Sequence, residues 1–384
     1  MRAYRRGVRA PFVLLGAMVL VWSGWASGNE PGELLEAKPF TDVDPAIRAL
    51  GAEALRVRYR STSDFEPRST IVSGVIFIPA GTPPEGGWPV LAHAHGTTGI
   101  RPECGPSLST NLWGATVLVT AYLKAGYAVA AADYQGLGAP GIHPYLDAKV
   151  AGWNVIDSVR ALRRARPGII SDRWVTIGGS QGGGASWAAA EQASTYAPEL
   201  HLVAAVNEVP AADIAGYAQK AADGALTRVQ GAAYSALLFS LSRVHPDLDM
   251  NLYRRGSVAA NWDALSMCYG PRMQERNDAV TKIEPGELKP ATPRATRALQ
   301  NLLSTMALPQ KKAAAPMLVI YAGQDEYIEA AWTRKAIAAA CEMGTQIEAD
   351  FQPTRSHGTF DGSHVLEWLS RRMAGEPVQN ACKS

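Results

Sequence analysis

Apolar residues along the chain gather in two kinds of segment that alternate with each other. Short runs of consecutive apolar residues, rich in valine and isoleucine, predict buried strands. They cover residues 55–59, 71–78, 88–94, 127–132, 174–178, 202–206, 317–321 and 346–351. Segments with apolar residues every three or four positions predict helices over 112–125, 154–166, 182–196, 329–343 and 364–373. This alternation predicts an α/β fold with a mostly parallel sheet covered by helices on both faces.

The alternation stops at about residue 210. Residues 210–312 are rich in alanine and predict helices, with no convincing strand. A helical block of this length between two sheet strands predicts a cap inserted over the strand ends. An independent helical domain with a structural role is the alternative. We therefore expect core segments over 29–209 and 313–384, separated by a helical cap over 210–312.

The N-terminus carries the pattern of a secretory signal peptide. Four arginines precede an apolar run over 11–22, and small residues over 23–28 follow it. The run is short for a bilayer span, so an uncleaved membrane anchor is the weaker alternative. We therefore expect residues 1–28 to be cleaved off and the protein to be secreted or periplasmic.

The overall composition is that of an ordinary globular protein, with 384 residues, 47% hydrophobic and 19% charged. The formal charge of +2 depends on the four N-terminal arginines, so nothing indicates a nucleic-acid partner. His93 and His95 form an H-x-H pair, but no nearby acidic or histidine cluster completes a metal site. We expect neither a metal nor another cofactor.

The four cysteines predict two disulfides in an oxidising compartment, and three pairings are open. Cys341 ends a predicted helix and Cys382 lies near the C-terminus. This favours a local bridge between these two, which leaves Cys104 to pair with Cys268.

The strongest candidate for chemistry is Ser180, in a Gly-Gly-Ser-Gln-Gly turn between the strand over 174–178 and the helix over 182–196. Glycines around such a turn remove Cβ atoms that would clash. The N-terminus of the following helix favours a developing negative charge. A serine hydroxyl also needs a base to accept its proton, and the base needs an orienting acid.

The acid and the base should follow the nucleophile in that order and lie in loops after later strands. Asp325 comes shortly after the strand over 317–321, and the adjacent Glu326 is the fallback. His357 lies in the loop after the last strand, whereas His364 starts the final helix. His357 is therefore the favoured base.

Two backbone N–H groups are expected to hold the oxyanion of the reaction. One is the Gln181 N–H, directly after the nucleophile. The loop after the strand over 88–94 reads His-Gly-Thr-Thr-Gly and offers the Thr97 N–H, with Thr98 as the alternative. Asp133 ends the next strand, where we expect it either to brace the oxyanion loop or the nucleophile turn or to be an ordinary turn residue.

With these residues assembled, the chain resembles the secretory lipase family, the lipase A-like branch of the α/β-hydrolases. The resemblance covers roughly residues 45–382 and rests on the motifs 95–99, 133–138 and 178–183 and on the run 194–200. It implies an α/β-hydrolase fold with a helical cap between sheet strands. It also implies the triad Ser180, Asp325 and His357 and the disulfides Cys104–Cys268 and Cys341–Cys382.

The sequence as a whole predicts an exported serine carboxylic-ester hydrolase, a lipase or esterase that forms an acyl-enzyme. Its partner would be a small-molecule or lipid ester, which could lie at a lipid–water interface. An acyltransferase or a serine peptidase would use the same machinery. A non-catalytic binding protein on the same scaffold is a weaker alternative.

Overall fold

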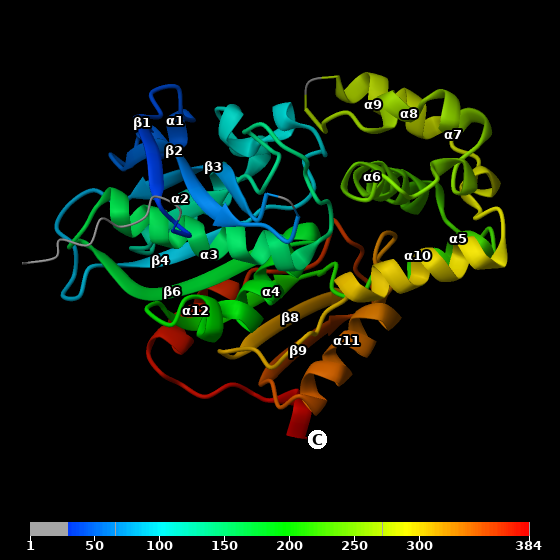
Figure 1. Cartoon of the computed structure of the whole chain (residues 1–384). Coiled ribbons are helices and arrows are strands. Elements are labelled where there is room, and N and C mark those ends of the chain that lie inside the picture. Colours follow the sequence, from blue (N-terminus) through cyan, green and yellow to red (C-terminus); the bar gives the residue numbers. More distant parts are fainter. Residues whose placement is uncertain (1–29, 66, 271, 384) are drawn as a thin grey trace, which may run out of the picture.

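The structure is a computed structural model that describes residues 30–383 except 66 and 271. The expected signal peptide over 1–28 lies outside the described residues. Within them, nine strands form a sheet in the order β1-β2-β3-β5-β4-β6-β7-β8-β9 (Figure 1). The strands are β1 (Leu34–Pro39), β2 (Glu53–Thr62), β3 (Ser69–Ile78), β4 (Trp88–Ala94), β5 (Ala128–Ala132), β6 (Ile170–Gly179), β7 (His201–Glu208), β8 (Met317–Ala322) and β9 (Ile347–Gln352).

The sheet is parallel from β5 through β4 to β9, and β1, β2 and β3 add an antiparallel edge. The expectation of a mostly parallel sheet is therefore confirmed. Because β6 lies between β4 and β7, the turn that follows β6 is near the middle of the sheet. Loops after the neighbouring parallel strands end at the same edge and can reach this turn.

Helices cover both faces of the sheet, as the sequence predicts. Successive strand residues point to opposite faces, so Val90 and Ala92 of β4 join one apolar core and Leu91 joins the other. The first core includes α3 (Ala148–Ala165), α4 (Gln181–Tyr196) and α11 (Ala330–Glu342). The second includes α1 (Pro45–Arg48), α2 (Thr116–Lys124) and α12 (Val365–Met373).

A helical insertion separates β7 from β8. Its described elements are α5 (Gly216–Ala222), α6 (Arg228–Val244), η4 (Met250–Leu252), α7 (Gly256–Ala260), α8 (Trp262–Leu265), α9 (Met273–Thr281), η5 (Pro285–Leu288) and α10 (Pro293–Met306). They share an apolar core that includes Tyr234, Leu237 and Leu299, and Ile100 and Ile328 of the sheet part also belong to it. The insertion lies beyond one end of the sheet (Figure 1). The segment boundaries at 209 and 312 stay a prediction.

Two disulfides fix the chain, in the pairing that the sequence favoured. Cys104 in η1 (Pro102–Cys104) bonds to Cys268 in the helical insertion, and Cys341 at the end of α11 bonds to Cys382. The first bridge therefore ties the sheet part of the molecule to the insertion. Among the described residues, no helix combines the length and the apolar character needed to cross a membrane.

Removal of the Cys104–Cys268 bridge should cost more stability than removal of the other one. The bridged residues lie 164 positions apart, against 41 for Cys341–Cys382. Loop entropy then predicts a difference of about 1 kcal/mol between two losses of about 2–5 kcal/mol each. Urea unfolding of the two Cys→Ala double variants measures both values. A larger loss for the Cys341–Cys382 variant would contradict the prediction.

Candidate active site

Ser180 occupies a strained turn between β6 and α4. Its backbone has φ 58° and ψ −119°, a region that residues with a Cβ rarely adopt. Ser180 N donates to the Glu208 carbonyl at 2.9 Å, and the Ser180 carbonyl accepts from Ala211 N at 3.0 Å. A Cβ at Gly178 would collide with the Gly182 carbonyl, and one at Gly182 with the Ala94 carbonyl. Glycine is thus required on both sides of the serine.

Asp325 and His357 meet in the loops that follow β8 and β9. His357 Nδ1 lies 2.8 Å from Asp325 Oδ2, and the Asp325 side chain is 3% exposed. Asp325 Oδ1 accepts from the backbone N–H groups of Tyr327 and Ile328, each at 2.8 Å. The carboxylate is therefore held in place on both oxygens.

The two fallback residues lie elsewhere. Glu326 accepts a hydrogen bond from the His357 backbone N–H at 3.2 Å, whereas the His357 ring is hydrogen-bonded to Asp325. His364 is the N-cap residue of α12 and makes no side-chain capping bond to the described helix, and its Nε2 is 3.7 Å from Asp350. Of these candidates, Asp325 and His357 alone form the hydrogen-bonded acid–base pair that the sequence anticipated.

A cavity of about 210 Å³ brings the serine and the histidine together. Ser180, His357 and Thr97 line it. Apolar and tyrosine side chains complete its wall: Leu146, Ala211, Ile214, Ala233, Ile328, Tyr145, Tyr217, Tyr269 and Tyr327. Within the described part of the chain, no hydrogen bond joins the Ser180 hydroxyl to the His357 ring. Such bonds often form only when substrate is bound.

The candidate oxyanion donors flank the serine. Thr97 lines the cavity, and its hydroxyl lies 2.9 Å from the Tyr145 hydroxyl. Thr98 instead directs its carbonyl to the Tyr269 N–H, at 2.9 Å. Neither the Thr97 N–H nor the Gln181 N–H donates to another residue that the structure describes. Both are therefore available to a reacting oxygen.

A buried histidine that the sequence did not assign fixes the Gln181 side chain. His143 Nδ1 lies 2.9 Å from the Gln135 carbonyl, so this nitrogen donates. Its Nε2 then accepts from the Gln181 amide, also at 2.9 Å. Burial lowers the pKa of His143 to about 3, so the ring is neutral. A neutral ring is the form that can make both hydrogen bonds.

Asp133 braces the loops behind the candidate oxyanion donors. Burial raises the pKa of its carboxyl group, and hydrogen bonds from Ser107 and Ser73 oppose this rise. Ser73 Oγ and Ser107 N donate to the carboxylate at 2.6 and 2.8 Å. The Asp133 carbonyl lies 3.0 Å from His95 Nε2. Asp133 thus links the loop over 95–99, the candidate oxyanion loop, to η2 (Pro106–Leu108) and β3.

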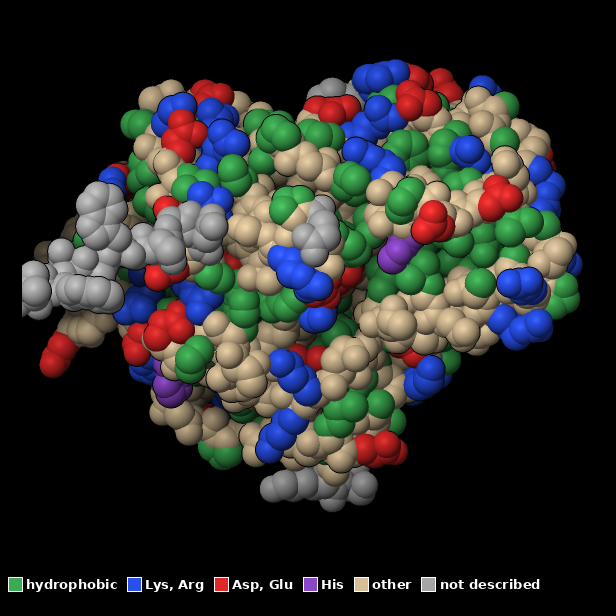
Figure 2. Space-filling model, viewed as in Figure 1, with side chains coloured by type: hydrophobic (Ala, Val, Ile, Leu, Met, Phe, Trp, Pro, Cys, Tyr) green, Lys and Arg blue, Asp and Glu red, His purple; other side chains and the backbone are tan. Residues whose placement is uncertain are grey.

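A second and larger cleft of about 690 Å³ lies between the sheet part and the insertion. The space-filling view shows the surface hollowed where these two parts meet (Figure 2). Asp147 and Glu191 belong to its polar wall, where burial raises their pKa values to about 6 and about 7. Leu241 and Leu302 of the insertion give it an apolar wall.

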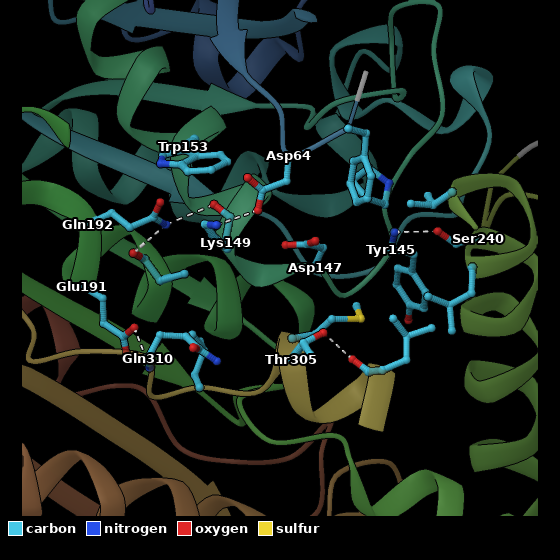
Figure 3. Close-up of a pocket in the computed structure, with 18 of the residues that line it drawn as sticks. Asp64, Tyr145, Asp147, Lys149, Trp153, Glu191, Gln192, Ser240, Thr305 and Gln310 are labelled. Carbon is cyan, nitrogen blue, oxygen red and sulfur yellow. Dashed lines mark hydrogen bonds and ion pairs between the residues drawn. The ribbon is translucent and has the colours of Figure 1, made fainter. Parts of the chain in front are cut away.

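Tyr145 lines both cavities and so lies where they adjoin. Its backbone N–H donates to Ser240 Oγ of α6 at 2.8 Å, as Figure 3 shows. Its hydroxyl contacts Thr97 on the other side. The tyrosine ring is therefore fixed between the small cavity at Ser180 and the larger cleft.

This sheet order, with the serine turn after β6 and helices on both faces, is that of the α/β-hydrolases. Candida antarctica lipase A in its closed state matches with a TM-score of 0.74 at 16% identity, over 92% of this chain and 85% of that one. A ligand-bound form of the rice cell wall degrading esterase LipA from Xanthomonas oryzae gives 0.68 at 20% identity, over 90% and 96%. At these identities the likeness shows the fold alone.

Within that class, the chain belongs to the secretory lipase family, whose model matches residues 105–381. A secreted triacylglycerol lipase of Malassezia globosa is 27% identical over 399 residues, 94% of this chain and 79% of that protein. A probable inactive lipase of Mycobacterium tuberculosis is 26% identical over 374 residues, 91% and 80% of the two proteins. Family membership supports a hydrolase of the lipase and esterase type.

The buried His143 predicts a pH-dependent stability term. Its pKa of about 3 in the folded state lies below the unfolded value of 6.5, so only the unfolded chain binds a proton as the pH falls below 6.5. Relative to His143→Gln, the wild type should lose about 2 kcal/mol of unfolding free energy between pH 7 and pH 5. Urea unfolding at both pH values measures this, with the exposed His201→Gln as the matched control. An equal difference at both pH values would contradict it.

Proposed function

We propose that the protein is an exported serine carboxylic-ester hydrolase in which Ser180, His357 and Asp325 form the catalytic triad. The observation that carries the proposal is the Asp325–His357 pair at the wall of the cavity that holds Ser180. Because Nδ1 donates to the carboxylate, Nε2 is the unprotonated nitrogen that can accept the serine proton. The pair thus sets the tautomer that a general base requires.

The reaction would proceed through an acyl-enzyme. Ser180 Oγ attacks the ester carbonyl while His357 Nε2 takes its proton, and the Thr97 and Gln181 N–H groups hold the oxyanion. His357 then returns the proton to the leaving alcohol. Water then attacks the acyl-enzyme while His357 takes its proton, and this step releases the carboxylic acid and restores Ser180. Asp325 stabilises the imidazolium without leaving its two backbone donors.

Export rests on separate support. Two disulfides suit an oxidising compartment, and the first 28 residues carry the charge and hydropathy pattern of a signal peptide. We propose a secreted or periplasmic protein whose core segments, 29–209 and 313–384, carry the triad. The helical cap over 210–312 supplies much of the substrate wall.

The cavity at Ser180 favours short acyl chains. Its volume of about 210 Å³ equals that of about seven water molecules. A longer chain has to pass Tyr145 to reach the cleft of about 690 Å³. We therefore propose an esterase of short-chain substrates.

Substitution of the triad should abolish ester turnover. Ser180→Ala and His357→Ala should each lower kcat for p-nitrophenyl butyrate by about 10⁴-fold or more, since nucleophile and base act as a unit. His364→Ala is the matched control, because His364 lies at α12 away from the cavity. Retained activity in Ser180→Ala would overturn the assignment. A wild-type protein inactive on all esters would overturn the proposed function and would agree with the name of the mycobacterial relative, a probable inactive lipase.

Tyr145→Ala should shift the acyl-chain preference of the enzyme towards longer chains. Loss of the ring joins the two cavities that adjoin at Tyr145, so p-nitrophenyl palmitate should gain relative to the butyrate. Tyr145→Phe is the control, because it removes only the hydrogen bond to Thr97. The kcat/KM ratio of the two esters measures the shift. The same ratio in both variants would contradict the role of the ring.

A further inference from the structure

Arg276 of α9 is a buried cation for which the described residues supply no acidic partner. The residue is 5% exposed, and within the described residues it forms no ion pair. Arg272, the N-cap residue of the same helix, is exposed and pairs with Glu275 through two hydrogen bonds of 2.8 Å. A guanidinium that leaves water is usually paired, because its desolvation is costly. Binding of an anionic group near Arg276 would therefore offset the desolvation of its guanidinium.

Its contacts direct it to the cavity at Ser180. Arg276 Nη2 donates to the Tyr269 hydroxyl at 2.8 Å, and the guanidinium carbon lies 3.9 Å from the centre of the Tyr269 ring. Tyr269 lines that cavity. Burial raises the pKa values of Tyr145 and Tyr327, which also line it, and the positive charge of Arg276 opposes both rises.

Tyr269 is fixed relative to the oxyanion loop although it belongs to the insertion. Its backbone N–H donates to the Thr98 carbonyl at 2.9 Å, and the preceding residue, Cys268, is bonded to Cys104. These two links place the phenol beside the loop that carries Thr97. A group bound by Tyr269 would therefore lie close to the reacting ester.

The hydrogen bond from Arg276 leaves the Tyr269 hydroxyl proton free to be donated to another group. A guanidinium only donates, so the Tyr269 oxygen accepts from Arg276 and its own proton must point elsewhere. No acceptor for that proton occurs among the residues that the structure describes. A phenol that accepts from a cation is a stronger donor, and the cavity is the space it lines.

We infer that Tyr269 and Arg276 form a specificity subsite for an ester that carries a carboxylate near its scissile bond. The inference rests on the proposed esterase function and adds the substrate class. The carboxylate would accept the Tyr269 proton and supply the counter-charge that Arg276 lacks. A half-ester of a dicarboxylic acid is the simplest substrate of this class. A neutral ester leaves the guanidinium unpaired.

Monoethyl and diethyl succinate test the subsite, because the half-ester carries a carboxylate where the diester carries a second, neutral ethyl ester. Hydrolysis in a pH-stat gives the ratio of the two kcat/KM values, and the wild type should prefer the half-ester. Arg276→Gln should lower this ratio at least about tenfold, and Tyr269→Phe should lower it in the same direction. Arg276→Lys, which keeps the charge, should retain most of the preference. Arg272→Gln, at the exposed N-cap of the same helix, is the matched control and should leave the ratio unchanged.

An unchanged ratio in folded Arg276→Gln would overturn the subsite. If that variant does not fold, an unchanged ratio in Tyr269→Phe overturns it equally. Failure of the proposed function has a different signature, since Ser180→Ala would then still hydrolyse the diester. The two outcomes are thus separable in one set of assays.

Discussion

The strained backbone of Ser180 is the constraint on which the rest of the site depends. A non-glycine residue at φ 58° costs on the order of 1–3 kcal/mol and persists only where its surroundings hold it. Here the Glu208 carbonyl and the Ala211 N–H bind its two peptide groups, and Gly178 and Gly182 allow strand and helix to approach. These partners come from β6, α4, the last residue of β7 and the segment after it. The turn therefore exists only when the centre of the sheet is assembled, which couples folding to the candidate active site.

The sequence predicted those parts of the site that have a local signal. The Ser180 turn has its own glycine pattern, and chain order selected Asp325 and His357, which the structure brings together. β1 was missed because most of its residues are exposed and show no apolar run. Helix α3 begins at Ala148 rather than 154, because Asp147 caps it through the Val150 N–H.

Contacts between distant segments could not be predicted in this way. The Gln181 amide meets His143, and the tyrosines of the cavity come from four separate stretches of chain. The residues of these contacts do not recur at a regular spacing along the chain. Each of them is placed by the packing of a different element. The helical insertion poses the same difficulty: its helical character was readable, but which of its side chains face Ser180 depends on how it docks.

Docking of the insertion is in turn tied to the oxyanion loop, through the Cys104–Cys268 bridge and the Tyr269–Thr98 hydrogen bond. This attachment separates two roles that Arg276 could have in ester hydrolysis. A cation that only stabilised the oxyanion would assist every ester alike, since each develops the same charge on the carbonyl oxygen. A cation that pairs with a substrate carboxylate assists only the ester that carries one. Arg276 donates to the Tyr269 hydroxyl and is not itself among the described residues that line the cavity with Ser180 and Thr97, so its charge reaches the substrate through Tyr269. This geometry favours the second role.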